Sequence, residues 1–141
     1  MRVIYTPTDG DRQEWTYRHG KVRASEAEMC ERRLEGVKWD GFEAAILQGA
    51  ARARRVLLWH LLRLAHPALK WDDTPDFFMS ELVIEMDLED SRSYRERMDA
   101  LPKTPDIVDA LAALDESIAE QEAKEGAAPK ARSNKSENAT G

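Results

Sequence analysis

The clearest hydrophobic pattern in the chain lies between Arg52 and Ala65. At about 100° per residue, five leucines of this segment share one broad face, and Arg55 and Arg63 fall on the opposite side with Trp59 among them. The pattern predicts a helix that buries its leucine face and stops at Pro67, because proline cannot continue a helix. We expect this helix to form the core through Leu57, Leu58, Leu61, Leu62 and Leu64.

Two other stretches have patterns typical of strands. Near the N-terminus, β-prone residues at 3–5 and 14–17 surround the turn-forming segment 8–11, which predicts a β-hairpin. Residues 82–88 alternate between Leu82, Ile84, Met86 and Leu88 and their more polar neighbours, which favours a strand, although a helix also accommodates the pattern.

Helix starts are indicated by capping residues. Ser25 and Glu28 have the spacing of a capping box, which predicts a helix that stops near Gly36. Asp40 is a good N-cap for a second short helix, which Gly49 ends or bends.

Two Thr-Pro pairs place a capping residue before a proline in the first helical position. Thr74–Pro75 predicts a single helical turn through Phe78. A further helical stripe from Leu88 ends at Pro102, and Thr104–Pro105 then opens an amphipathic helix that Gly126 closes.

These elements predict a mainly α protein of the α+β class. An N-terminal β-hairpin packs on a small helical core, followed by amphipathic helices and a disordered C-terminal tail. We expect a hairpin and core domain at 1–101, an amphipathic C-terminal helix at 102–126, and a tail at 127–141 that is too poor in apolar residues to fold.

Composition narrows the class of protein. The 141 residues carry a net charge of -6, which argues against a dedicated nucleic-acid binder. Cys30 is the single cysteine, which excludes an intrachain disulfide and a Cys-based zinc site. The start is too polar for a secretory signal, and no apolar run approaches the roughly 20 residues of a membrane span. We expect the protein to work in a cytoplasm.

No catalytic motif has specific spacing, so we expect no enzyme, cofactor or metal. Asp72, Asp73 and Asp76 lie near His66, which invites a metal interpretation, but acidic residues at a helix start are better explained by the helix dipole. His60 is expected on a helix surface rather than as a base.

The candidate partner-binding residues form two groups. Arg55 and Arg63 lie one turn from Trp59 and are expected to stack on its ring, which is either buried under the hairpin or exposed as a partner site. The second group is an apolar stripe on the last helix, which either docks on the domain or lies in a partner's groove. It comprises Ile107, Leu111, Leu114 and Ile118.

Residues 51–63 (ARARRVLLWHLLR) and 66–73 (HPALKWDD) resemble tail assembly chaperones of long-tailed phages that infect actinobacteria. Those proteins often have a Trp-containing helix with a basic end, then a proline and a short aromatic-acidic segment. The similarity covers roughly a third of the chain, and its residues are of packing rather than chemical type.

The resemblance implies a non-structural protein of the host cytoplasm that binds the tape measure protein and recruits tail tube subunits. It also implies a longer form made by a -1 ribosomal frameshift, and a homo-oligomer is possible. The alternatives are a head-to-tail adaptor that stays in the virion and a regulator that contacts DNA through the arginine helix. An enzyme ranks last.

The frameshift can be tested in the encoding DNA. If Ala128–Lys130 is encoded as GCC-CCA-AAG, the codons contain a slip sequence of the X-XXY-YYZ type. We expect this heptamer, an overlapping -1 frame and a long downstream frame rich in helical heptads; a DNA sequence without them removes the frameshift from the hypothesis.

Overall fold

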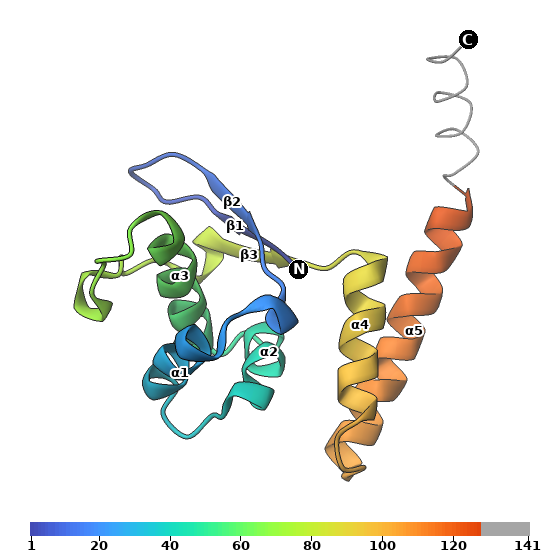
Figure 1. Ribbon diagram of the computed structural model, residues 1–141. Helices are drawn as coiled ribbons and strands as arrows, with labels where there is room; N and C mark the ends of the chain where they lie inside the picture. Colours follow the sequence, from blue (N-terminus) through green and yellow to red (C-terminus); the bar gives the residue numbers. More distant parts are fainter. Residues whose placement is uncertain (128–141) are drawn as a thin grey trace. The chain divides into compact units, whose positions relative to one another are not determined.

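The computed structural model describes residues 1–127, so the expected disordered tail from 128 onward and the slip position Ala128–Lys130 lie outside the described residues. The predicted mainly α, α+β class is confirmed: the described residues form five α-helices, a three-stranded antiparallel sheet and three short 3-10 turns (Figure 1). In chain order these are β1 (Arg2–Tyr5), β2 (Gln13–Thr16), η1 (His19–Lys21), α1 (Ala24–Arg33), α2 (Trp39–Leu47), α3 (Ala51–Ala65), η2 (Trp71–Asp73), η3 (Met79–Glu81), β3 (Leu82–Glu85), α4 (Leu88–Asp99) and α5 (Pro105–Ala127).

The described residues divide into two compact units, 1–85 and 86–127. The boundary therefore falls after Glu85, whereas the sequence analysis placed it after Leu101. The difference has a physical reason: α4 packs along α5 and belongs with it rather than with the core.

The sheet of the first unit has the order β2-β1-β3, with both pairs antiparallel. The predicted hairpin is present. The strand predicted over residues 82–88 is formed only at 82–85, since Leu88 already begins α4, and β3 pairs along β1 so that Val3 lies opposite Ile84. The middle strand is buried at Val3, Ile4 and Tyr5. Because β3 comes from the far end of the unit, the sheet closes the first 85 residues into one body.

Helices α1, α2 and α3 pack against one another beside this sheet (Figure 1). Phe42 and Ile46 of α2 are fully buried, as are Leu57 and Leu58 of α3. Tyr17, just after β2, packs edge-on against Phe42, with the two ring centroids 6.4 Å apart, and this contact joins the sheet to the helices.

The core helix extends over the predicted range, but its apolar face is shorter than the periodicity indicated. Leu57, Leu58 and Leu61 are buried, whereas Leu64 is 64% exposed. His60, expected at the surface, is buried at 6% exposure. The middle of α3 is thus covered on several sides, whereas an amphipathic surface helix buries only one face.

Two expected helix caps are not formed. The residue before α1 is Arg23, which makes no side-chain cap bond, and Glu28 pairs with Arg32 instead of closing a capping box. The residue before α2 is Lys38 rather than Asp40. The carboxylate of Glu31 accepts the backbone N–H of Trp39 at 2.8 Å, so α1 caps the next helix.

The helical turn predicted after Thr74–Pro75 is also wrong. Residues 75–78 are not helical, and 3-10 turns occur on either side of them. Thr74 has an extended backbone, as residues before proline usually do. Glu81 then fixes the segment by accepting the backbone N–H of Phe78 at 2.7 Å and that of Thr8 at 2.6 Å.

The second unit is an antiparallel pair of helices, α4 and α5. Asp87 caps α4 by accepting the backbone N–H of Asp90 at 2.8 Å. The predicted cap at Thr104 is confirmed, because its hydroxyl accepts the backbone N–H of Ile107 at 3.3 Å. Within the described part of the chain, no helix has the length and apolar character needed to cross a membrane.

We predict that Leu61→Asp unfolds the first unit, because Leu61 is 1% exposed and aspartate there is a buried, unpaired charge that costs several kcal/mol, roughly 3–5. Leu64→Asp is the matched control on the same helix, at a position that is 64% exposed. Thermal melts followed by circular dichroism compare the two variants; equal melting temperatures for both contradict the assignment of the core.

Candidate functional site

Two tryptophans anchor the segment that follows α3. The ring of Trp71 meets that of Trp59 edge-on, with centroids 5.5 Å apart, and the indole N–H of Trp59 donates to the carbonyl of Leu69 at 3.2 Å. Both rings are buried, at 4% and 8% exposure. From the sequence, Trp59 was expected either to be buried under the hairpin or to be exposed as a partner site. It is buried, and the contacts on it come from residues 69–71 and α1 rather than from the hairpin.

Arginines cover the two rings from outside. The guanidinium of Arg63 lies 4.7 Å from the centroid of Trp59, as the sequence analysis expected. Arg55 was expected on the same ring, but it lies 4.8 Å from Trp71. Side chains of a helix lean toward its N-terminus, so Arg63 reaches back over Trp59 while Arg55 leans away from it. Arg33 of α1 lies within 6 Å of both rings.

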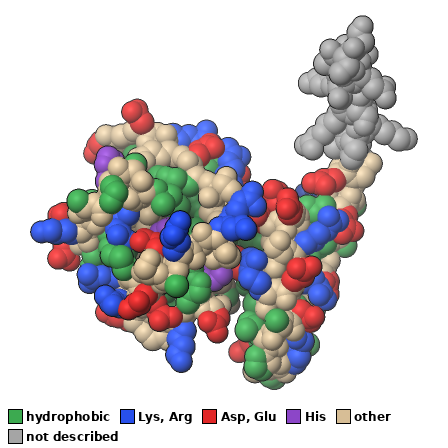
Figure 2. Space-filling model, viewed as in Figure 1, with side chains coloured by type: hydrophobic (Ala, Val, Ile, Leu, Met, Phe, Trp, Pro, Cys, Tyr) green, Lys and Arg blue, Asp and Glu red, His purple; other side chains and the backbone are tan. Residues whose placement is uncertain are grey.

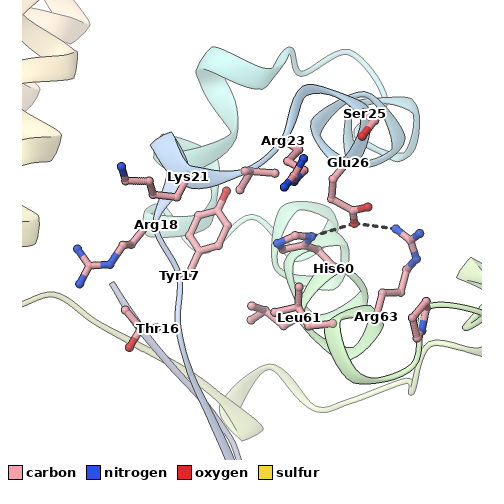
Figure 3. Close-up of a pocket in the computed structure, with 13 residues that line it drawn as sticks. Thr16, Tyr17, Arg18, Lys21, Arg23, Ser25, Glu26, His60, Leu61 and Arg63 are labelled. Carbon is pink, nitrogen blue, oxygen red and sulfur yellow. Dashed lines mark hydrogen bonds and ion pairs between the residues drawn. The ribbon is translucent and has the colours of Figure 1, made fainter.

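The helices α1 and α3 are joined by a polar network at Glu26. One oxygen of the Glu26 carboxylate accepts the Nδ1–H of His60 at 2.9 Å and a guanidinium N–H of Arg63 at 2.7 Å (Figure 3). The side chains of His60 and Arg63 are 8% and 13% exposed. Hydrogen bonds to a charged group in such partly buried positions are worth more than surface ion pairs.

Cys30 lies one turn further along α1, and the candidate metal ligand atoms of Glu26, Cys30 and His60 are all within 4.8 Å of one another. The arrangement is better explained as packing. The guanidinium of Arg63 already occupies the Glu26 oxygen and opposes a metal cation there. Burial raises the pKa of the Cys30 thiol to about 12, and the Glu26 carboxylate adds to the rise. The thiol is therefore protonated at neutral pH.

The acidic residues that invited a metal interpretation lie elsewhere. Asp72 and Asp73 are exposed in the short turn η2, and Asp76 and His66 are exposed as well. Because no helix starts at Thr74, the helix dipole does not explain them.

The concavities of the first unit include two that are both lined by Arg63 and Pro67. One, of about 580 Å³, is lined by the two tryptophans, Met29 and several cations; we call it the tryptophan pocket. The other, of about 510 Å³, lies between the end of β2, α1 and α3 (Figure 3). Its lining includes Arg18, Lys21 and Arg23, and we call it the basic pocket.

The candidate stripe on α5 faces α4. Leu111 and Ile118 are buried, and Ile107 and Leu114 are partly exposed. The pair is tied by Arg95, whose guanidinium bonds to Asp115 and holds the pKa of that carboxyl below its ordinary value. The stripe and the Trp59 group therefore lie in different units.

Sequence reasoning missed the basic pocket and the Glu26 network. Arg18, Lys21 and Arg23 are close in sequence, but only the fold places them beside α3. Glu26 and His60 are 34 positions apart, and nothing in the spacing of either indicates the bond between them.

The chain was compared with models of protein families, with curated proteins and with solved structures, and it matches none of them.

We predict that Glu26→Gln lowers the free energy of unfolding by about 1–3 kcal/mol, because His60 and Arg63 both lose their charged acceptor. Glu28→Gln is the matched control on the same helix, since its pair with Arg32 is exposed to solvent. Denaturant titrations measure both variants, and a Glu26 variant as stable as the Glu28 variant contradicts this account of the network.

Proposed function

We propose that this chain is a tail assembly chaperone of a long-tailed phage, which binds the tape measure protein in the host cytoplasm and recruits tail tube subunits to it. The segment that carries the resemblance, residues 51–73, forms α3 and the turn that packs back onto it. The resembling residues thus supply most of the lining of the tryptophan pocket, and α1 supplies the rest. This pocket is the surface we assign to the tape measure protein.

One observation carries the proposal: the tryptophan pocket is a preformed concavity lined by apolar side chains and by cations. Trp59 and Trp71 are fixed by ring and hydrogen-bond contacts, so a ligand does not have to order them. Met29 is 36% exposed in the lining, which leaves apolar surface open. Aromatic and arginine side chains in such settings are enriched among residues that dominate binding energy.

The pocket is suited to an amphipathic helical segment. Its volume of about 580 Å³ admits a few apolar side chains from one helix face. Arg32, Arg33 and Lys70 lie in the lining and favour carboxylates that flank the apolar residues. A tape measure protein is a long helical molecule whose apolar seams need such cover before the tube is built around it.

Charge supports the same role. Residues 86–127 contain twelve Asp or Glu and five Lys or Arg, a net charge of -7. Acidic side chains are spread over the visible face of α4 and α5 (Figure 2). A chaperone that holds an aggregation-prone partner benefits from such a charged unit, because like charges keep complexes apart.

A binding role also accounts better for the buried polar groups than catalysis does. His60 is 6% exposed and Glu26 already accepts two hydrogen bonds, so the pair is occupied in joining α1 to α3.

The test is co-expression with the tape measure protein encoded by the same phage genome. We expect the chain to co-purify with it and to raise its soluble fraction. Met29→Glu combined with Lys70→Glu should weaken this binding at least about tenfold, as expected for residues at the centre of an interface.

Val108→Glu serves as the control, because Val108 is a 51% exposed apolar residue on α5, away from the pocket. Retained binding by the double variant contradicts the assignment of the surface, and no capture by the unmodified chain contradicts the chaperone. Mass spectrometry of purified virions separates the alternatives: a chaperone is absent, whereas a head-to-tail adaptor is present.

A further inference from the structure

The basic pocket holds cations that the structure does not neutralise. Arg18, Lys21 and Arg23 line it and are exposed, and none of the three has a carboxylate within ion-pair distance in residues 1–127. In Figure 3, the charged ends of Arg18 and Lys21 point outward from the segment after β2, away from Glu26 and Arg63, so these two cations stand at the outer rim of the cavity. The carboxylate of Glu26 is already shared by His60 and Arg63.

The start of α1 adds to this positive field. Arg23 precedes the helix without a side-chain cap bond, so the first backbone N–H groups of α1 remain available beside the cavity. The helix dipole also places its positive end there. In a chain with a net charge of -6, this local excess of positive charge favours an anionic ligand at the pocket.

A matching anionic surface exists on the same chain. On α5, four exposed acids lie within roughly 80° of arc at about 100° per residue, and we call them the acidic stripe. None of them has an ion-pair partner in the described part of the chain. The acidic stripe consists of Asp106, Asp109, Glu116 and Glu120.

The acidic stripe lies opposite the face of α5 that packs on α4. Leu111 and Ile118, the buried residues of α5, fall roughly 170° from the centre of the stripe at about 100° per residue. Ala113 is the small exposed residue between the acids, so another surface can approach the helix closely there.

We propose that the acidic stripe of one copy binds in the basic pocket of a second copy, so that the chain associates head to tail. The carboxylates of α5 then meet the cations of the pocket rim and the open start of α1. Because the two surfaces differ, a pair of copies keeps one free pocket and one free stripe, and assembly continues by addition of copies. The inference is independent of the tape measure protein.

Sedimentation velocity on the full chain tests this proposal. We expect the average mass to rise above 16.1 kDa with concentration in about 50 mM NaCl and to return to it in about 500 mM, since salt screens charges on the surface. An average mass that stays at the monomer value up to about 200 µM in low salt overturns the proposal. The same result is expected, and the proposal is equally overturned, if the acidic stripe of a chain binds the basic pocket of that same chain.

Two variants make the test specific. The pocket variant carries Arg18→Glu, Lys21→Glu and Arg23→Glu, and the stripe variant carries Asp109→Lys, Glu116→Lys and Glu120→Lys. All six positions are exposed, and circular dichroism melts check that both variants fold. Each variant alone should remain monomeric.

An equal mixture of the two variants should associate again, because the acidic stripe of the pocket variant meets the basic pocket of the stripe variant, and the two charge-reversed surfaces are also complementary to each other. The control variant carries Glu89→Lys, Glu96→Lys and Glu125→Lys. It makes the same charge change as the stripe variant at positions outside the stripe, and its dissociation constant should lie within about twofold of that of the unmodified chain. A mixture that stays monomeric, or a control that loses association, overturns the proposal. Since no tape measure protein is present, failure here leaves the proposed function to its own test.

Discussion

Burial of the middle of α3 on all sides is the constraint on which the first unit depends. Six consecutive residues, 56–61, are buried, and six residues cover more than one full turn of a helix. Such a helix cannot be covered by one neighbour. Four elements have to cover it: the sheet, α1, α2 and the segment around Trp71. Each of them supplies side chains that suit the residues on the face of α3 that it covers. Leucines take apolar neighbours, Trp59 takes Trp71, and His60 takes Glu26.

The same constraint explains the polar groups of the site. A histidine at the centre of a buried helix needs a hydrogen-bond acceptor, because an unpaired polar group there costs free energy. Glu26 supplies that acceptor, and Arg63 then balances the charge of the carboxylate. The side chain of Arg63 also covers Trp59 and lines both pockets. The packing of the core and the shape of the candidate binding surface are therefore determined by the same few contacts.

The sequence predicted the elements better than their partners. Strong local patterns gave the hairpin, the helix of α3 and the cap at Thr104, because each depends on residues close in the chain. The assignment of His60 to the surface was wrong because amphipathic periodicity assumes that one side of a helix meets water. The cap of α2 comes from Glu31, and the cover of Trp59 comes from Trp71. These are tertiary contacts, and capping or stacking rules applied to neighbouring residues do not reveal them.

The distribution of charge separates the roles of the two units. Residues 1–85 contain thirteen Lys or Arg and fourteen Asp or Glu, a net charge of -1, whereas residues 86–127 carry -7. Near-neutral charge on the first unit allows local cationic concavities to exist without strong repulsion inside it. The acids of the second unit lie on a helical pair, with those of the acidic stripe on a face that its own packing does not use. A chain with its cations around concavities and its acids along a helix has complementary surfaces, and this complementarity is the basis of the proposed association between copies.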